Sequence, residues 1–308
     1  MITRRLAGTD LALSVIGLGC WAMGGEAWGA VDESEAIRTI HAALDGGVSW
    51  LDTAPLYGGS DAIVARALRG RSAIIATKVG ARVDGGRAIS DLSATHITTD
   101  CEASLRRLSV ETIDLLQVHW PCDRSTPLTE SFAALMALRD AGKIRHIGVC
   151  NYGPEALAEI RAIAPVVSLQ TPYSLLRRGF EQDGLAQAGE GLSVLAYEGL
   201  CRGLLTGKYT TPPRFPEHDI RSRDPRFSGA QFTAIARFAA DLGRVGERVG
   251  ASAAAVALGW VAARPGITAV IAGMRSPQQV ADNLVAARLL PRRKLWDVVD
   301  RVAGRHGL

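Results

Sequence analysis

The 308-residue sequence lacks several features that would point to particular functions. Neither a Rossmann-type glycine fingerprint nor a P-loop follows a predicted strand, so a nucleotide cofactor would have to be bound in another way. The formal net charge is only +4, and Lys and Arg form no basic block. Nucleic acid and anionic membrane surfaces are therefore not expected partners.

Cysteine is scarce, and its spacing excludes two common uses of this residue. The chain has five cysteines, namely Cys20, Cys101, Cys122, Cys150 and Cys201. Their number is odd, and no two are spaced like ligands of a metal ion. We interpret them as reduced thiols of a cytoplasmic protein, and we expect no metal site.

Long apolar runs are also missing. The stretch from Leu11 to Met23 follows two arginines and superficially resembles a signal peptide, but four glycines interrupt it and no convincing cleavage site follows. The run from Ala251 to Ala263 is too short to cross a bilayer and predicts a buried, alanine-rich helix. The sequence therefore predicts no membrane segment.

The chain is long enough for one α/β barrel or two smaller domains, because 47% of its residues are hydrophobic. Strand-like and helix-like segments alternate without a break in composition. The expected strands end near residues 18, 52, 78, 119, 150, 170, 197 and 271. This alternation predicts a single (β/α)8 barrel spanning residues 1–308, with a hairpin near residues 4–11 and an extra C-terminal helix at 291–307.

One long segment, residues 201–228, has no regular pattern and contains four prolines. Loops of this length in compact domains are usually functional or disordered. Two interpretations therefore stay open, a lid over a ligand and a flexible surface insertion.

Polar side chains stand at the ends of three consecutive predicted strands. Asp52 ends one of them, Lys78 ends the next, and His119 ends the third, while Tyr57 follows Asp52 on the adjoining loop. In a parallel barrel these strand ends share one rim, where catalytic residues collect. A solvated turn would explain any one of these residues, but four in this order favour a polar site.

These residues resemble the catalytic tetrad of the aldo-keto reductase family. The matching motifs are Asp52-Thr-Ala-x-x-Tyr57-Gly, the strand-end Lys78 and the Gln-Val-His119-Trp run. The resemblance covers nearly the whole chain, and it is to bacterial members near the branch that contains the potassium-channel β subunits. It implies that the N-terminal hairpin caps the bottom of the barrel and that an extended NADPH lies across the rim.

The tetrad has a simple chemical interpretation. Tyr57 would give a proton to a carbonyl oxygen, and the Lys78 cation would bring the pKa of this phenol towards neutral pH. Asp52 would keep Lys78 charged and oriented, and His119 would hold the carbonyl oxygen.

The resemblance also implies the residues that hold NADPH. Near the nicotinamide it assigns Gly19, Trp21, Asp52, the carboxamide ligands Asn151 and Gln170, and the stacking ring of Tyr197. At the pyrophosphate it assigns Leu200, Arg202, Gly203 and Lys208, and at the adenosine phosphate Gly273, Arg275, Gln279 and Asn283. Arg275 is the reason to prefer NADP over NAD, because its planar fork suits a 2′-phosphate.

Three residues depart from the family pattern. Cys20 and Cys150 stand where the family usually has Thr and Ser, and Glu198 replaces a Ser beside the expected pyrophosphate. A carboxylate there would repel phosphate. Glu198 either turns away to pair with an arginine such as Arg202, which we prefer, or makes cofactor binding unusual.

The sequence leaves three functions open. The first is NADPH-dependent reduction of a small aldehyde, ketone or sugar. The second is oxidation of a sugar or polyol on the same scaffold, and the third is a non-catalytic, NADPH-binding regulatory subunit. The complete tetrad argues against the third. Neither the substrate nor the oligomeric state follows from the sequence.

Overall fold

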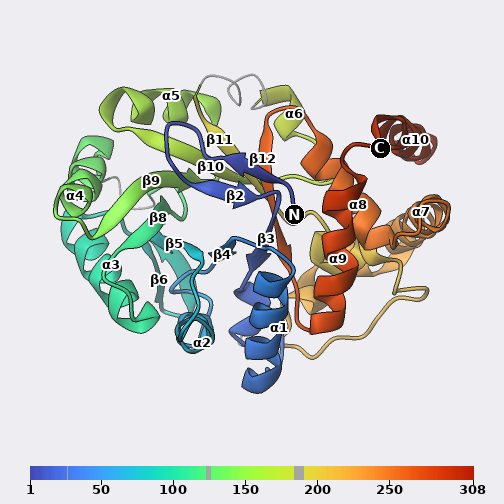
Figure 1. The fold of residues 1–308 in the computed structure, drawn as a ribbon, viewed down its shortest axis with the longest axis horizontal. Coiled ribbons are helices and arrows are strands. Elements are labelled where there is room, and N and C mark those ends of the chain that lie inside the picture. Colours follow the sequence, from blue (N-terminus) through green and yellow to red (C-terminus); the bar gives the residue numbers. More distant parts are fainter. Residues whose placement is uncertain (26, 123–125, 184–190) are drawn as a thin grey trace.

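The computed structural model describes residues 1–25, 27–122, 126–183 and 191–308. Eight parallel strands close into a barrel in the order β10-β11-β12-β3-β4-β5-β8-β9 (Figure 1). They are β3 (Ile16–Gly19), β4 (Trp50–Asp52), β5 (Ile74–Val79), β8 (Ile113–Val118), β9 (Ile144–Cys150), β10 (Val166–Pro172), β11 (Ser193–Tyr197) and β12 (Ile267–Gly273). The predicted (β/α)8 architecture is confirmed, whereas its interpretation as one independent domain stays a prediction.

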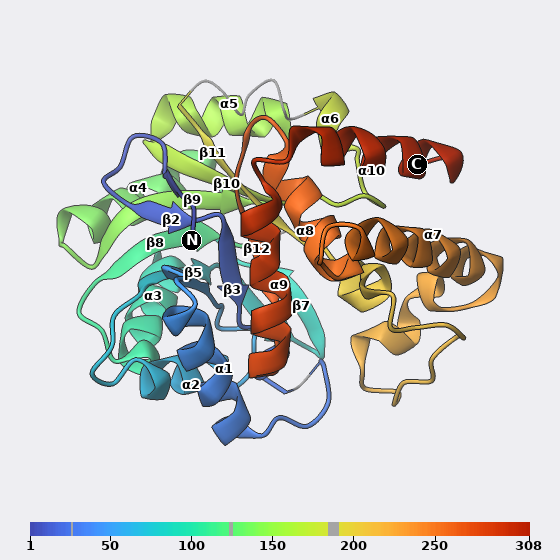
Figure 2. The ribbon, with the colours of Figure 1, turned by 45° about the vertical axis from the view of Figure 1, so that its right-hand side comes forward.

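Helices surround the barrel and lie close to their expected positions (Figure 2). They are α1 (Glu33–Asp45), α2 (Ser60–Ala67), α3 (Ala94–Leu108), α4 (Leu128–Asp140), α5 (Pro154–Ile163), α6 (Phe180–Asp183), α7 (Gly229–Glu247), α8 (Ala253–Ala263), α9 (Pro277–Leu289) and the extra C-terminal helix α10 (Arg293–Arg305). Side chains cap several helix starts; Asp32, for example, accepts the backbone N–H of Glu35. A short helix was expected over 180–188, and its last residues lie outside the described part.

The N-terminal hairpin closes the bottom of the barrel. Its strands are β1 (Thr3–Arg5) and β2 (Ala12–Ser14). Leu6, Leu11 and Leu13 are buried in the same apolar cluster as Trp50 of β4. The Ala7 backbone N–H donates to Ser193 Oγ at the start of β11 (2.8 Å). The predicted cap is therefore confirmed, and its role is to cover the barrel interior.

A second hairpin, which we did not predict, follows β5 at the other end of the barrel. Its strands are β6 (Ala81–Asp84) and β7 (Arg87–Ser90). Gly85 and Gly86 form the turn with positive φ angles of 55° and 79°, which a two-residue hairpin favours. The Asp84-Gly85-Gly86 run was therefore a usable signal that we overlooked.

The segment 201–228 is folded rather than a flexible insertion. It contains the 3₁₀ turns η3 (Cys201–Thr206), η4 (Ile220–Arg223) and η5 (Pro225–Phe227). Phe215 and Phe227 pack edge to face (5.0 Å between centroids), and both contact Tyr209. In Figure 2 this segment lies beneath α7. An aromatic core of its own gives it a defined shape.

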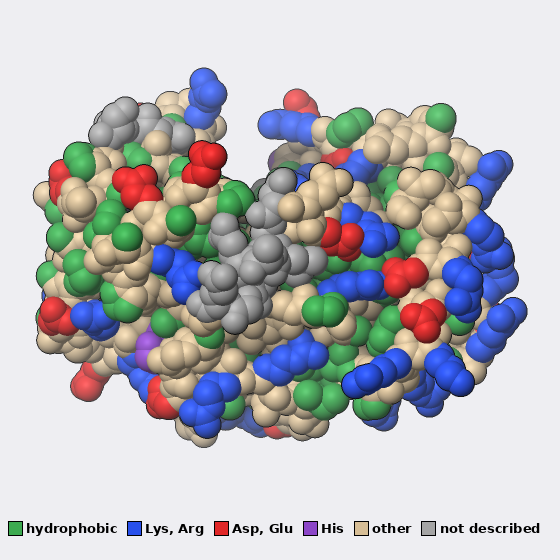
Figure 3. Space-filling model, turned by 90° about the horizontal axis from the view of Figure 1, so that it is seen from above, with side chains coloured by type: hydrophobic (Ala, Val, Ile, Leu, Met, Phe, Trp, Pro, Cys, Tyr) green, Lys and Arg blue, Asp and Glu red, His purple; other side chains and the backbone are tan. Residues whose placement is uncertain are grey.

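The surface is mixed in charge. Lys and Arg side chains gather at the end that carries α7 and α10, with Asp and Glu among them (Figure 3). Helix α10 packs against α7 and α8. Among the helices of the described residues, none is long and apolar enough to cross a membrane.

Candidate active site

Asp52 and Lys78 form a buried ion pair at the centre of the rim. Lys78 Nζ donates to Asp52 Oδ1 (2.7 Å) and to the Thr53 carbonyl (3.0 Å). The two side chains come from adjacent strands, β4 and β5, and are almost fully buried. Burial alone would lower the pKa of Lys78, but the nearby Asp52 and Tyr57 raise it above its ordinary value. Lys78 is therefore held as a cation.

Tyr57 lies beside this cation. Lys78 Nζ is 4.8 Å from the centroid of the Tyr57 ring. Burial raises the pKa of Tyr57, and the Lys78 charge opposes this effect without cancelling it. We expected Lys78 to bring the phenol towards neutral pH. The direction of its influence is as expected, but burial outweighs it. Tyr57 keeps its proton at neutral pH, the form that a proton donor requires.

His119 completes the cluster. Its ring lies edge-on to Tyr57 (6.0 Å between centroids) and stacks on Trp120 (4.0 Å). Burial, and secondly the Lys78 charge, hold the pKa of His119 well below its ordinary value of 6.5. The imidazole is therefore neutral at neutral pH and can donate one N–H to an oxygen atom. Its Nδ1 is buried without a hydrogen-bond partner in the described part of the chain.

Two glutamines support the ion pair from below. Gln170 Nε2 donates to Asp52 Oδ2 (2.8 Å), and it also lies 3.3 Å from Gln117 Oε1. We expected Gln170 to hold a nicotinamide carboxamide; here its amide nitrogen is used to orient Asp52. Gln117 was not assigned a role from the sequence. A partial signal was available, because Gln117 lies on β8 and His119 directly follows the last residue of that strand.

Asn151 and Tyr197 are brought together at the ends of β9 and β11. Tyr197 donates its hydroxyl proton to Asn151 Oδ1 (2.8 Å), and Asn151 Nδ2 donates to the His119 carbonyl (3.1 Å). Burial raises the pKa of Tyr197 to about 12. Asn151 has a positive φ of 65°, an uncommon conformation that this bonding fixes. A fixed amide and an aromatic ring thus border the tetrad.

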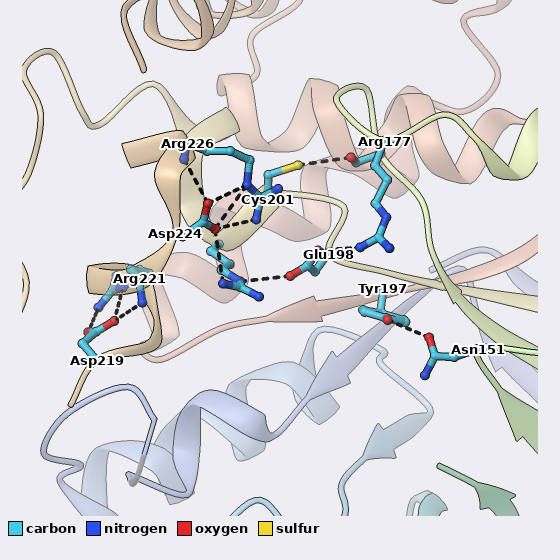
Figure 4. A network of polar contacts seen from close by, with 11 residues as sticks. Asn151, Arg177, Tyr197, Glu198, Cys201, Asp219, Arg221, Asp224 and Arg226 are labelled. Carbon is cyan, nitrogen blue, oxygen red and sulfur yellow. Dashed lines mark hydrogen bonds and ion pairs between the residues drawn. The ribbon is translucent and has the colours of Figure 1, made fainter. Parts of the chain in front are cut away.

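Glu198 is paired with arginine, as we preferred (Figure 4). Its Oε1 lies 3.0 Å from Arg202 Nε, and its Oε2 lies 3.6 Å from Arg177. Arg202 also contacts Asp224 (3.2 Å), which Arg226 holds from the other side (2.6 Å). This network ties the end of β11 to the segment 201–228. The two arginines thereby balance the negative charge of the Glu198 carboxylate.

The expected pyrophosphate loop is tightly turned. The backbone N–H groups of Cys201 and Gly203 donate to the carbonyls of Glu198 and Leu200 (2.8 and 2.9 Å). These two N–H groups are therefore already engaged within the loop. Lys208 is exposed on the same loop.

Arg275 is engaged at the other end of the expected cofactor path. Its guanidinium donates to the carbonyls of Trp28 (3.0 Å) and Ala30 (2.7 Å). Its backbone N–H donates to Gln279 Oε1 (2.8 Å). Gln279 is exposed, but Asn283 is only 4% exposed. The structure therefore brings Arg275 and Gln279 together at the surface and places Asn283 below it.

The glycines of the rim differ in how much space surrounds them. A Cβ on Gly19 would lie 2.8 Å from Ile271, and one on Gly24 would lie 1.5 Å from the Tyr57 carbonyl oxygen. Gly19 thus leaves room for the Ile271 side chain, and Gly24 admits the loop that carries Tyr57. Gly273 differs, because a Cβ there would meet no atom within 4 Å. It borders open space at the rim.

The chemistry of these groups fits an extended dinucleotide. Aromatic Tyr197 with Trp21 could flank a nicotinamide, and Arg202 with Lys208 could face a pyrophosphate. Helix α9 starts at a Ser276 cap, whose Oγ accepts the backbone N–H of Gln279 (3.3 Å), and such helix ends attract anions. Among the described residues, no group of three or more His, Cys, Asp or Glu could hold a metal ion.

Comparison with known proteins agrees with this geometry. A family model described as the aldo/keto reductase family matches residues 15–301. The chain is 39% identical to aldo-keto reductase YhdN of Bacillus subtilis over 283 residues, covering 89% of this chain and 85% of that protein. It is 30% identical to the NADH-specific methylglyoxal reductase of Escherichia coli over 304 residues, covering 92% and 93%.

A solved structure is also similar over nearly its whole length. The glycerol dehydrogenase AKR11B4 of Gluconobacter oxydans has a TM-score of 0.88 and 40% identity, with 99% of this chain and 95% of that chain covered. This chain belongs to the aldo-keto reductase family, whose members are oxidoreductases that use nicotinamide cofactors.

Proposed function

We propose that this protein transfers a hydride between NADP(H) and a small carbonyl or alcohol substrate. The observation that carries the proposal is the cluster of Asp52, Lys78, Tyr57 and His119 at one rim, with a neutral imidazole and a protonated phenol. When bound, the reduced nicotinamide supplies a hydride to the carbonyl carbon. Tyr57 gives its proton to the carbonyl oxygen as the C=O double bond becomes single, and the product is an alcohol.

The other members of the cluster prepare this step. Neutral His119 donates an N–H to the substrate oxygen and fixes its position. Once Tyr57 has given up its proton, Lys78 stabilises the resulting phenolate, because a cation 4.8 Å from the ring centroid offsets the new negative charge. Asp52, oriented by Gln170, keeps Lys78 in place. Trp21, Asn151 and Tyr197 would hold the nicotinamide against the substrate.

Arg275 supports the choice of NADP, because a guanidinium near the α9 N-terminus suits a 2′-phosphate. The similarity to an NADH-specific reductase makes this a direct question for experiment. With short aldehydes as substrates, the purified protein should oxidise NADPH with a higher kcat/KM than it oxidises NADH. Equal kcat/KM values for the two cofactors would contradict the NADP preference.

Oxidation of a polyol is the second candidate. It is favoured by the similarity to a glycerol dehydrogenase over nearly the whole chain. The same residues serve in reverse, since phenolate Tyr57 would accept the alcohol proton as hydride leaves the carbon. Reduction of NADP by glycerol or related polyols at high pH, compared with aldehyde reduction at neutral pH, distinguishes the two directions. NADPH binding without either activity would instead favour the third possibility, a non-catalytic regulatory subunit.

A further inference from the structure

The segment from Ala27 to Ala30 links the proposed adenosine end of the site to the catalytic residues. Arg275 holds this segment through the carbonyls of Trp28 and Ala30. Arg275 is also the residue proposed to bind a 2′-phosphate. Phosphate oxygens are stronger acceptors of guanidinium N–H groups than neutral carbonyls are. A bound 2′-phosphate therefore competes with the two carbonyls for the same side chain.

Trp28 lies between two glycines with positive φ, Gly25 (89°) and Gly29 (80°). Such glycines let the backbone change direction at low cost. Besides Arg275, the segment is held by a hydrogen bond from Ile220 N to the Ala27 carbonyl (2.9 Å) and by Arg221 over the Trp28 ring (5.1 Å). Loss of the Arg275 contacts removes two of the segment's anchors among the described residues, and the segment can shift.

A shift of Trp28 would reach the proton donor through ring contacts. The Trp28 ring lies edge-on to Trp21 (5.2 Å, 90°), and Trp21 stacks on Tyr57 (5.9 Å, 28°). Trp28 Nε1 is buried and has no acceptor in the part of the chain that the structure describes. A buried donor without a partner is unfavourable, so another position of this ring, or a substrate oxygen beside it, would be favoured.

We propose that Arg275 couples the 2′-phosphate of NADP(H) to Trp28, and that Trp28 is a specificity-determining residue for the carbonyl substrate. The inference rests on the proposed function. With NADPH, Arg275 turns to the 2′-phosphate, and the Trp28 ring moves away from Trp21. With NADH, which lacks this phosphate, Arg275 keeps the carbonyls and Trp28 stays against Trp21. The same substrate thus contacts a different arrangement of aromatic side chains with each cofactor.

A binding experiment tests the first half without turnover. The full-length protein is titrated with adenosine 2′,5′-bisphosphate and with adenosine 5′-monophosphate while tryptophan fluorescence is followed. We expect the bisphosphate to bind more tightly and to change the fluorescence, and we expect Trp28→Phe to remove most of that change. Arg275→Ala should abolish the difference between the ligands. Arg288→Ala should preserve it, because Arg288 is an exposed arginine near the far end of α9, the helix that begins just after Arg275.

Steady-state kinetics test the second half. We expect the KM of one aldehyde to differ about fivefold or more between NADPH and NADH in the wild type, a typical size for coupled sites. In Arg275→Ala the two KM values should converge. Tight bisphosphate binding without a Trp28-dependent signal overturns the coupling, as do equal wild-type KM values. If no carbonyl is reduced with either cofactor, the proposed function fails, while the fluorescence result still decides whether Arg275 moves Trp28.

Discussion

Lys78 is a buried cation, and its presence at the rim depends on Asp52. Leaving one member of such a pair unpartnered usually costs about 3–5 kcal/mol of stability. Changes at Asp52 or Lys78 therefore mix loss of folding with loss of chemistry. Tyr57 and His119 are better probes of mechanism, because neither is a partner in an ion pair of the described residues.

Tyr57→Phe removes the proposed proton donor and little else. We expect carbonyl reduction to fall about 10²- to 10⁴-fold, the usual contribution of general acid catalysis, with cofactor affinity nearly unchanged. Turnover and cofactor fluorescence titration measure the two effects. Tyr152→Phe is the matched control, since its buried hydroxyl has no hydrogen-bond partner among the described residues. Wild-type turnover in Tyr57→Phe would remove Tyr57 from the mechanism.

His119 should make stability depend on pH. Its pKa is lowered in the native state by burial and then by Lys78, so below pH 6.5 the unfolded chain binds a proton that the native protein does not. Stability is then fully present above pH 6.5 and lost as pH falls, by up to about 1.4 kcal/mol per pH unit from this one group. Urea unfolding at pH 5 and pH 7.5 should show a smaller difference in His119→Gln. An unchanged difference would contradict the assignment.

Asp52, Lys78 and His119 were predictable because each one lies at or next to the end of a strand of recognisable pattern. Tyr57 was predictable because it follows Asp52 on the adjoining loop. The long-range contacts of the site residues were harder to predict from the sequence. Arg275 contacts carbonyls that lie about 250 positions away in the chain, and no local pattern encodes such a contact. Burial was equally hidden, which is why the direction of the net shift in the pKa of Tyr57 was expected wrongly.

At the scale of elements, regular periodicity identified the barrel strands and most helices. The β6–β7 hairpin was missed because its strands are only four residues long and half exposed. The segment 201–228 has no periodic pattern, and its order comes from contacts among Tyr209, Phe215 and Phe227 that only the fold brings together.

The ion network at Glu198 joins two elements and should control cofactor release. Removing the carboxylate in Glu198→Ser frees one contact of Arg202 and one of Arg177. We expect NADPH to bind roughly fivefold more tightly, corresponding to about 1 kcal/mol for a partly exposed pair. Because Arg202 also anchors the segment through Asp224, the off-rate and turnover should change together.

Stopped-flow release of NADPH at two salt concentrations tests this prediction. Glu217→Ser is the control, because it removes an exposed carboxylate from the same segment. Tighter binding with strong salt dependence and unchanged turnover would show that Glu198 acts through bulk repulsion of the pyrophosphate, rather than through the network.

For the molecule as a whole, the two ends of the barrel have different roles. The carboxyl ends of the strands carry the ionisable cluster, and the amino ends are sealed by leucines of the N-terminal hairpin. In barrels of this kind, residues of the bottom face contribute to stability and those of the top face to function. Substitutions at the bottom should thus separate the two properties.

Leu6→Ala tests that separation. Leu6 is fully buried in the cluster that contains Trp50 and Leu115, so its truncation leaves a cavity and should cost about 2–5 kcal/mol of unfolding free energy. KM and kcat measured well below the unfolding temperature should stay within about twofold of wild type, since effects at distant, independent sites are nearly additive. Leu6→Met keeps the volume and should cost less than about 1.5 kcal/mol. Denaturant unfolding and steady-state kinetics on wild type, Leu6→Ala and Leu6→Met test this prediction. A large change in KM with little change in stability would mean that the hairpin influences the rim. The proposed division of roles between the two ends of the barrel would then be wrong.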